Sequence, residues 1–310
     1  MIPRSRRALI VLLASLAPAA ACAQPVPMEY QYLYGSGEAA AQSIATFHQL
    51  TDYAHAEAAR RKRGARLRQA VLTSGSNLDT PRFTPCGRKP LAVVFDIDET
   101  LLLNLGFERW LALGLRPADV SVGKAWDQWE ETGMEQVAPL PGAVAALKVL
   151  RADGITVVFN SNRSTAHVDG TIKTLAFAGL AQAGQAHPGM TLFTDPTPAS
   201  APDHAKKDGR RAQIAQLYCV IAMVGDQLGD FSDLFNAPKL MAKTPSSNPP
   251  ALPGRRKLAQ SEALEQVWGH GWFVLPNSTY GTQVNPHASD ETIFPDRKMD
   301  WAYKIPAKGD

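Results

Sequence analysis

The fold is decided by one stretch, Leu91-Ala92-Val93-Val94-Phe95-Asp96-Ile97-Asp98-Glu99-Thr100. Its first half is a short, continuous apolar run that ends directly in acidic residues. Such a run is typical of a strand that is buried on both faces, as in a parallel sheet. Four further strands are predicted from similar runs at residues 155–159, 190–193, 219–224 and 272–275.

Helical patterns separate these apolar runs, and they lie at residues 36–70, 105–138, 143–152, 165–178 and 206–217. Strands that alternate with helices predict an α/β fold with a doubly wound parallel sheet. We expect one domain over residues 24–310. Residues of about 30–75 and 103–138, with part of the C-terminus, are expected to form a smaller helical cap over the substrate.

The first 23 residues have the order of a secretory signal peptide. Three arginines precede an apolar run at residues 8–21, which is shorter than the ~20 residues of a membrane-spanning helix. The end of this run is compatible with two processing sites. Cleavage after Ala23 leaves Gln24 first, whereas a bacterial lipobox leaves a lipid anchor on Cys22. We therefore expect export to the periplasm, the outer membrane or the medium.

The mature chain keeps two cysteines, Cys86 and Cys219. An oxidising compartment permits a disulfide between them, but two unpaired thiols are the preferred interpretation. The net charge of +3 comes largely from two basic runs, at residues 60–63 and 255–257. Because no aromatic side chains are interleaved with these runs, they predict a solvated surface and no nucleic-acid binding.

Polar residues follow each strong strand, and in an open α/β sheet such residues meet outside the carboxyl ends of the strands. Asp96 and Asp98 follow the first strand. One carboxylate can attack phosphorus and the other can transfer protons, so the pair predicts covalent phosphoryl chemistry.

The later strands add the remaining parts of this predicted site. Ser161 and Asn162 follow the second strand, and Lys207 precedes a helix. These side chains can bind phosphoryl oxygens. Asp226 and Asp230 follow the fourth strand. Four carboxylates in one crevice require a cation, and hard oxygen ligands beside phosphate select Mg²⁺.

This order of motifs resembles the haloacid dehalogenase (HAD) superfamily. The resemblance implies that Asp96 is the nucleophile and that Asp98 is the general acid/base, which also contacts the metal through its backbone carbonyl. It further implies that Ser161 and Lys207 bind phosphate, that Asp226 is a metal ligand, and that Asp230 supports the metal site.

A closer resemblance covers nearly the whole mature chain and points to the class C acid phosphatases, the bacterial lipoprotein e 5′-nucleotidase family. It rests on residues 34–38, 95–100, 126–129, 141–143, 161–163, 207–210, 225–231 and 275–281. The segment after Asn104 lacks the family's usual Ser-Pro-Tyr. The resemblance implies a lipid-anchored homodimer that acts on nucleoside 5′-monophosphates. It also places Trp126 and Tyr280 on the wall of the substrate cleft, where a flat ring can stack on a base.

The sequence thus predicts an exported, Mg²⁺-dependent acid phosphatase that hydrolyses small phosphate monoesters through an aspartyl-phosphate. Two alternatives stay open at this point. The same motifs would serve a phosphotransferase, and the same fold could serve a non-catalytic storage or binding protein.

Overall fold

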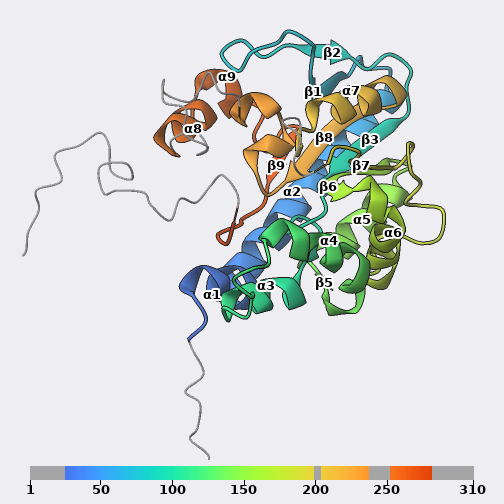
Figure 1. Cartoon of the computed structure of the whole chain (residues 1–310). Coiled ribbons are helices and arrows are strands. Elements are labelled where there is room, and N and C mark those ends of the chain that lie inside the picture. Colours follow the sequence, from blue (N-terminus) through green and yellow to red (C-terminus); the bar gives the residue numbers. More distant parts are fainter. Residues whose placement is uncertain (1–24, 199–203, 237–251, 281–310) are drawn as a thin grey trace, which may run out of the picture.

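The computed structural model describes residues 25–198, 204–236 and 252–280, and its centre is a five-stranded parallel sheet (Figure 1). The strands stand in the order β7-β6-β3-β8-β9. Their bounds are Leu192–Asp195, Thr156–Ser164, Leu91–Phe95, Cys219–Gly225 and Trp272–Val274. All five predicted strands are confirmed, and the α/β fold is confirmed with them.

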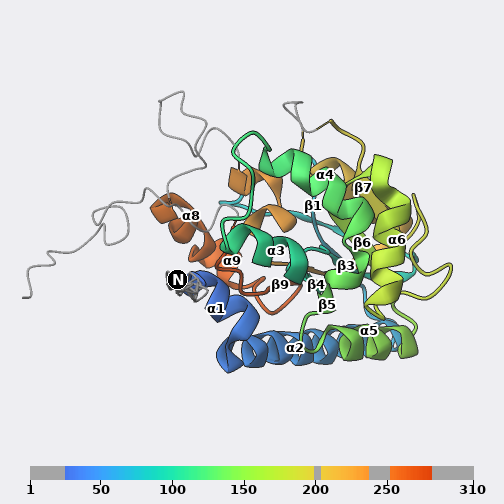
Figure 2. The same ribbon diagram turned by 60° about the horizontal axis from the view of Figure 1, so that its bottom comes forward.

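Side chains alternate across this sheet and divide the core into two layers. Val93 and Phe95 of β3 pack with α2 (Gly37–Lys62), α5 (Ala143–Ala152) and α6 (Val168–Phe177). Ala92 and Val94 pack on the other face, with residues of α7 (Asp208–Leu217) and α9 (Glu262–Glu265). Figure 2 shows α2 and α5 side by side beneath the sheet. Both faces of β3 are therefore buried in the core, which explains its uninterrupted apolar sequence.

The long helix α2 begins and ends at local signals. The Ser36 hydroxyl accepts a hydrogen bond from the Ala39 N–H at 3.1 Å and caps the first turn. Gly64, just past the end, has a φ of +83°, a conformation that favours glycine. Our prediction of helix up to Ala70 is wrong, because β1 (Arg68–Leu72) follows and pairs with β2 (Phe83–Pro85). The apolar side chains of β1 are buried in the core, so packing decides the conformation here.

Three helices from the predicted cap segments lie near one another (Figure 2). They are α1 (Met28–Gly35), α3 (Leu105–Ala112) and α4 (Val122–Thr132). A small antiparallel pair, β4 (Leu102–Leu103) with β5 (Ala138–Pro139), flanks the segment that holds α3 and α4, and β4 follows the turn after β3. By contrast, α2 and β1 also fall in the range 30–75, yet they pack against the main sheet. The role of α1, α3 and α4 as a substrate cap stays a prediction.

Short helical segments complete the described chain. They are η1 (Met134–Gln136), η2 (Thr165–His167), η3 (Leu228–Asp230), η4 (Asp233–Asn236) and α8 (Leu252–Ala259). Among the helices of the described ranges, none combines the length and the hydrophobicity that a membrane crossing needs. The predicted signal peptide and Cys22 lie outside the described residues.

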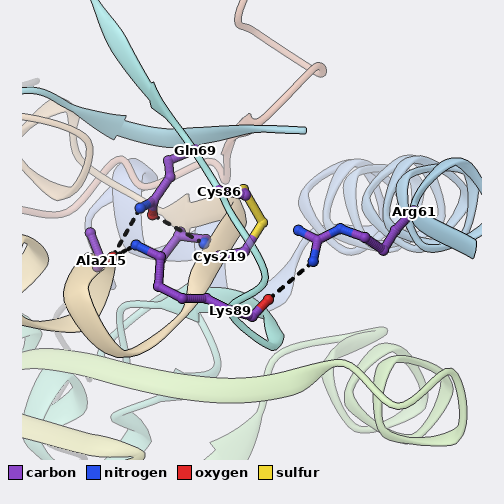
Figure 3. Close-up of a disulfide and its surroundings, with 7 residues drawn as sticks. Arg61, Gln69, Cys86, Lys89, Ala215 and Cys219 are labelled. Carbon is purple, nitrogen blue, oxygen red and sulfur yellow. Dashed lines mark hydrogen bonds between the residues drawn. A yellow bond between two sulfur atoms is a disulfide. The ribbon is translucent and has the colours of Figure 1, made fainter. Parts of the chain in front are cut away.

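Cys86 and Cys219 form a disulfide, so the preferred interpretation of two unpaired thiols is wrong (Figure 3). Both cysteines are fully buried. The bond ties the first residue of β8 to the loop after β2, across a sequence separation of 133 residues. Gln69 reinforces the same junction, because its Nε2 donates to the Ala215 carbonyl at 2.9 Å and its Oε1 accepts from the Val220 N–H. The sequence could not decide this pairing, since it depends on where the β1–β2 hairpin lies.

A cross-link over so long a loop should stabilise the folded chain by restricting the unfolded one. The double variant Cys86→Ala/Cys219→Ala is expected to lose about 2–5 kcal/mol of unfolding free energy. Thermal unfolding monitored by circular dichroism checks this. A reductant should lower the melting temperature of the wild type and leave that of the double variant unchanged. Equal melting temperatures for the two proteins under oxidising conditions would contradict the prediction.

Candidate functional site

The candidate active site lies where the parallel strands end at their carboxyl edge. Asp96 follows β3, Asn160 to Asn162 lie within the end of β6, Asp226 follows β8, and Asn277 follows β9 closely. Because these strands are parallel neighbours, residues up to 181 positions apart meet in space, as the Tyr280–Glu99 hydrogen bond demonstrates. This is the crevice predicted from the sequence.

Three carboxylates form the centre of the site. Asp96, Asp226 and Asp230 each place an oxygen within 4.8 Å of the others. The hydroxyl of Thr100 donates within this group, at 3.1 Å to Asp226 Oδ1 and at 3.3 Å to Asp96 Oδ2. Asn277 Nδ2 donates to the other oxygen of Asp226 at 2.8 Å. Neutral donors thus fix the orientation of the carboxylates without cancelling their charge.

Because Gly225 has no side chain, the side chain of Asp230 can pack directly against the backbone at position 225. A Cβ atom at position 225 would lie 2.3 Å from the Cβ of Asp230, which no packing tolerates. Arg211 holds the following turn, because its Nη1 donates to the carbonyls of Gly229 and Asp230 at 3.0 and 2.9 Å. Asp230, which we predicted as a supporting residue, therefore stands in the cluster itself.

Lys207 supplies the positive charge next to these carboxylates. Its Nζ donates to Asp96 and, at 2.7 Å, to Asp230. The side chain is buried, whereas that of Lys206 is exposed. The structure thus places Lys207 in the site, as the spacing of the motif predicted.

The electrostatics of the cluster are those of an anionic, buried site. Burial raises the pKa of Asp96 to about 7, against the opposing effect of Lys207. Burial and the neighbouring charges of Asp230 and Asp96 raise the pKa of Asp226 well above its usual range. Among the described residues, Lys207 is the only cationic side chain hydrogen-bonded to this cluster, and it bonds to Asp96 and Asp230 but not to Asp226. The remaining negative charge and the all-oxygen donor set fit a divalent cation.

Asp98 lies apart from that cluster and is bound by Arg163. The guanidinium donates to Asp98 Oδ1 from Nη2 at 2.7 Å and from Nε at 3.0 Å, and the arginine is only 1% exposed. Asn104 Nδ2 donates to the same carboxylate at 3.0 Å. Ser161 is fully buried, and its hydroxyl donates weakly to Asp98 at 3.5 Å and accepts from the Arg163 N–H. The carboxylate of Asp98 is consequently held in one orientation.

Glu99, which received no role from the sequence, organises the turn after β3. It has a φ of +51° and is fully buried. Its carboxylate accepts hydrogen bonds from the Tyr34 hydroxyl at 3.0 Å, from Asn104 N–H at 2.9 Å, and from the Tyr280 hydroxyl. The helix α1 and the end of the described chain are thereby joined to the turn after β3.

A cleft of about 790 Å³ opens above these groups. Asp96, Asp98, Lys207 and Asp226 line it, as do Asn162, Trp126 and Tyr280. Asn162 is oriented by Arg210, whose Nη2 donates to its Oδ1 at 2.6 Å. The sequence-predicted residues therefore converge on one cavity, except that Ser161 lies beneath its surface.

Trp126 is held firmly in the wall of this cleft. Its Nε1 donates to Glu130 at 2.6 Å, and the same carboxylate accepts from the Ser164 N–H at 2.9 Å. The Arg163 guanidinium stands 5.7 Å from the centre of the indole ring. Sequence reasoning missed Arg163, Glu130 and Asn277. Arg163 lies within the end of β6 and Asn277 follows β9, at the same carboxyl edge as Ser161 and Asp226, whereas Glu130 on α4 carried no such signal.

Comparison with known proteins agrees with this geometry. The sequence model of the family described as "HAD superfamily, subfamily IIIB (Acid phosphatase)" matches residues 38–283. Two solved structures of the class C acid phosphatase from Bacillus anthracis, one of them with tungstate bound, share the fold. Each is 21% identical, with a TM-score of 0.59 over 87% of this chain and 95% of the other. The chain thus belongs to subfamily IIIB of the HAD superfamily, the acid phosphatases, and it is a phosphomonoesterase.

Proposed function

We propose that this acid phosphatase is Mg²⁺-dependent and hydrolyses nucleoside 5′-monophosphates and similar small monoesters through a phosphoenzyme on Asp96. The observation that carries the proposal is the position of Asp96. Its carboxylate lines the cleft, accepts a hydrogen bond from the Lys207 ammonium, and lies within 4.8 Å of the other two carboxylates of the cluster. The tungstate of the Bacillus anthracis structure, an oxyanion like phosphate, supports an oxyanion site in this fold.

In the first step, a carboxylate oxygen of Asp96 attacks phosphorus and the bond from phosphorus to the leaving oxygen breaks. Asp98 gives its proton to that leaving oxygen. In the second step, Asp98 takes a proton from water, the water oxygen attacks phosphorus, and the bond to Asp96 breaks. Inorganic phosphate leaves and both aspartates return to their starting states. Lys207, at hydrogen-bond distance from Asp96 and Asp230, can neutralise a phosphoryl oxygen.

Asp96, Asp226 and the backbone carbonyl of Asp98 would hold the Mg²⁺, with Asp230 beside them. When bound, the cation would offset the charge between the anionic nucleophile and the anionic substrate. The fit is supported by the excess of negative charge described above. Thr100 and Asn277 keep the oxygens of Asp226 oriented, so the ligand is held in place before the cation arrives.

Export and assembly are also proposed. The Cys86–Cys219 disulfide supports an oxidising compartment, because cytosolic thiols are kept reduced. The signal-like segment points the same way, with either a free N-terminus or a lipid anchor at Cys22. A homodimer rests on the family resemblance alone.

The nucleophile is tested by Asp96→Asn. The amide cannot attack phosphorus, so hydrolysis of p-nitrophenyl phosphate should fall by roughly 10³-fold or more. The exposed Asp119 offers a matched control, since Asp119→Asn makes the same chemical change away from the cleft. Retained turnover in Asp96→Asn would overturn the assignment, provided that its circular dichroism spectrum matches the wild type.

The cation site is tested by Asp226→Asn. Millimolar Mg²⁺ should raise the melting temperature of metal-stripped wild type by a few degrees, because a ligand that binds only the folded state stabilises it. Loss of the Asp226 charge should abolish most of this rise and the activation of hydrolysis by Mg²⁺. The melting temperature is measured by scanning calorimetry with and without a chelator. An identical response in wild type, Asp119→Asn and Asp226→Asn would exclude Asp226 as a ligand.

Base stacking is tested by Trp126→Ala. Stacking of a base on an aromatic ring contributes about 1–3 kcal/mol, which corresponds to roughly 5- to 150-fold in kcat/KM. The ratio of kcat/KM for adenosine 5′-monophosphate to that for ribose 5-phosphate should therefore fall by about tenfold. Ribose 5-phosphate lacks the base and serves as the internal control. An unchanged ratio would show that the indole ring does not contact the base.

A further inference from the structure

The cleft continues beyond the catalytic groups between the helices α1, α3 and α4. Tyr30, Phe107, Glu108, Leu111 and Trp126 line this part of it. Phe107 and Trp126 pack edge to face, with ring centres 4.9 Å apart. This part of the cleft thus combines aromatic rings with a carboxyl group, on helices that carry none of the catalytic aspartates. We call it the helical side of the cleft.

Glu108 has an unusual environment for a buried carboxyl group. Its side chain is on the first turn of α3, and the residue is only 3% exposed. Its Oε2 has no hydrogen-bond partner among the residues that the structure describes. A buried polar atom without a hydrogen-bond partner is rare, and it lowers the stability of a folded protein. Such an atom therefore indicates a hydrogen-bond donor that a bound ligand would supply.

The two other buried glutamates nearby show what a satisfied carboxyl group looks like. Glu130 accepts hydrogen bonds from the Trp126 ring and from the backbone of Ser164. Glu99 accepts from two tyrosine hydroxyls and from Asn104. Glu108 is therefore the exception in this region, although it is equally buried.

The charges around Glu108 indicate which partner would fit. Burial raises the pKa of Glu108 to about 8, and the acidic neighbours Glu99 and Asp98 add to the effect. Its charge in turn helps to raise the pKa of Tyr30, after the effect of burial. A cation would relieve this repulsion, and the faces of aromatic rings also attract cations.

We propose that Glu108 binds a protonated amine carried by the leaving group of the substrate. The ammonium would donate a hydrogen bond to Oε2 and lie among the rings of Tyr30, Phe107 and Trp126. This inference rests on the proposed function, because the phosphoryl group must occupy the Asp96 end of the same cleft. The site would thus select aminoalkyl phosphates over their uncharged counterparts.

Binding of stable phosphonates tests the proposal without requiring turnover. Aminoalkylphosphonates of increasing chain length are each paired with the alkylphosphonate and the hydroxyalkylphosphonate of equal length. Their affinities for the whole enzyme in Mg²⁺ buffer are measured by isothermal titration calorimetry. At the best chain length, the aminoalkylphosphonate should bind about tenfold more tightly than the alkylphosphonate or the hydroxyalkylphosphonate. About a tenfold difference in affinity is what one charge-assisted hydrogen bond contributes.

Glu108→Gln keeps the shape of the side chain but removes the charge, so the preference should shrink to about twofold or less. Glu135→Gln makes the same change on an exposed residue and should keep the full preference. Glu108→Met is a second variant of similar volume, in case the glutamine variant does not fold. Equal affinities for the amine and its partners in the wild type, or an undiminished preference in both Glu108 variants, would overturn the proposal.

Hydrolysis of p-nitrophenyl phosphate, measured in parallel, distinguishes a failure of the amine site from a failure of the proposed phosphatase activity. Turnover without a preference for the amine would contradict only the proposed role of Glu108. An amine preference that depends on Glu108, without turnover of any phosphate monoester, supports the amine site and removes the proposed function.

Discussion

The mutual repulsion of three carboxylates, two of them on buried residues, is the constraint on which the site depends. Oxygens of Asp96, Asp226 and Asp230 lie within 4.8 Å of one another. At that separation each like-charged pair costs roughly 3–4 kcal/mol at an effective dielectric constant of about 20. Lys207 offsets one negative charge, and Thr100 and Asn277 orient the oxygens without neutralising them. A divalent cation would offset the negative charge that Lys207 leaves uncompensated, and carboxylate oxygens are the ligands that suit it.

A second group of contacts connects the turn after β3 to the wall of the cleft. Arg163 binds the Asp98 carboxylate and lies over the Trp126 ring, whose Nε1–H donates a hydrogen bond to Glu130. Glu99 joins the same turn to Tyr34 and Tyr280. The position of Asp98, the proposed general acid, is therefore coupled to the residues that line the wall of the cleft. Glu108 stands out in this network, because its Oε2 alone among these carboxyl oxygens is buried and without a described partner.

Much of this arrangement could be predicted from the sequence, for physical reasons. Burial on both faces makes strands such as β3 uniformly apolar, and the topology of a parallel sheet then brings the residues after each strand together. The predictions failed where tertiary packing decides. Residues 68–72 form a strand because they pair with β2, and the cysteines pair because that hairpin lies over β8. Glu108 and Glu130 could not be found, since neither follows a strand and the motif on α4 covers only residues 126–129.

Anomalous diffraction from crystals grown with Mn²⁺ in place of Mg²⁺ tests the central claim most directly. The account predicts one strong peak at the end of β3, within about 2–2.5 Å of carboxylate oxygens of Asp96 and Asp226. A peak only elsewhere on the molecule, or none at the cluster at saturating Mn²⁺, would contradict it.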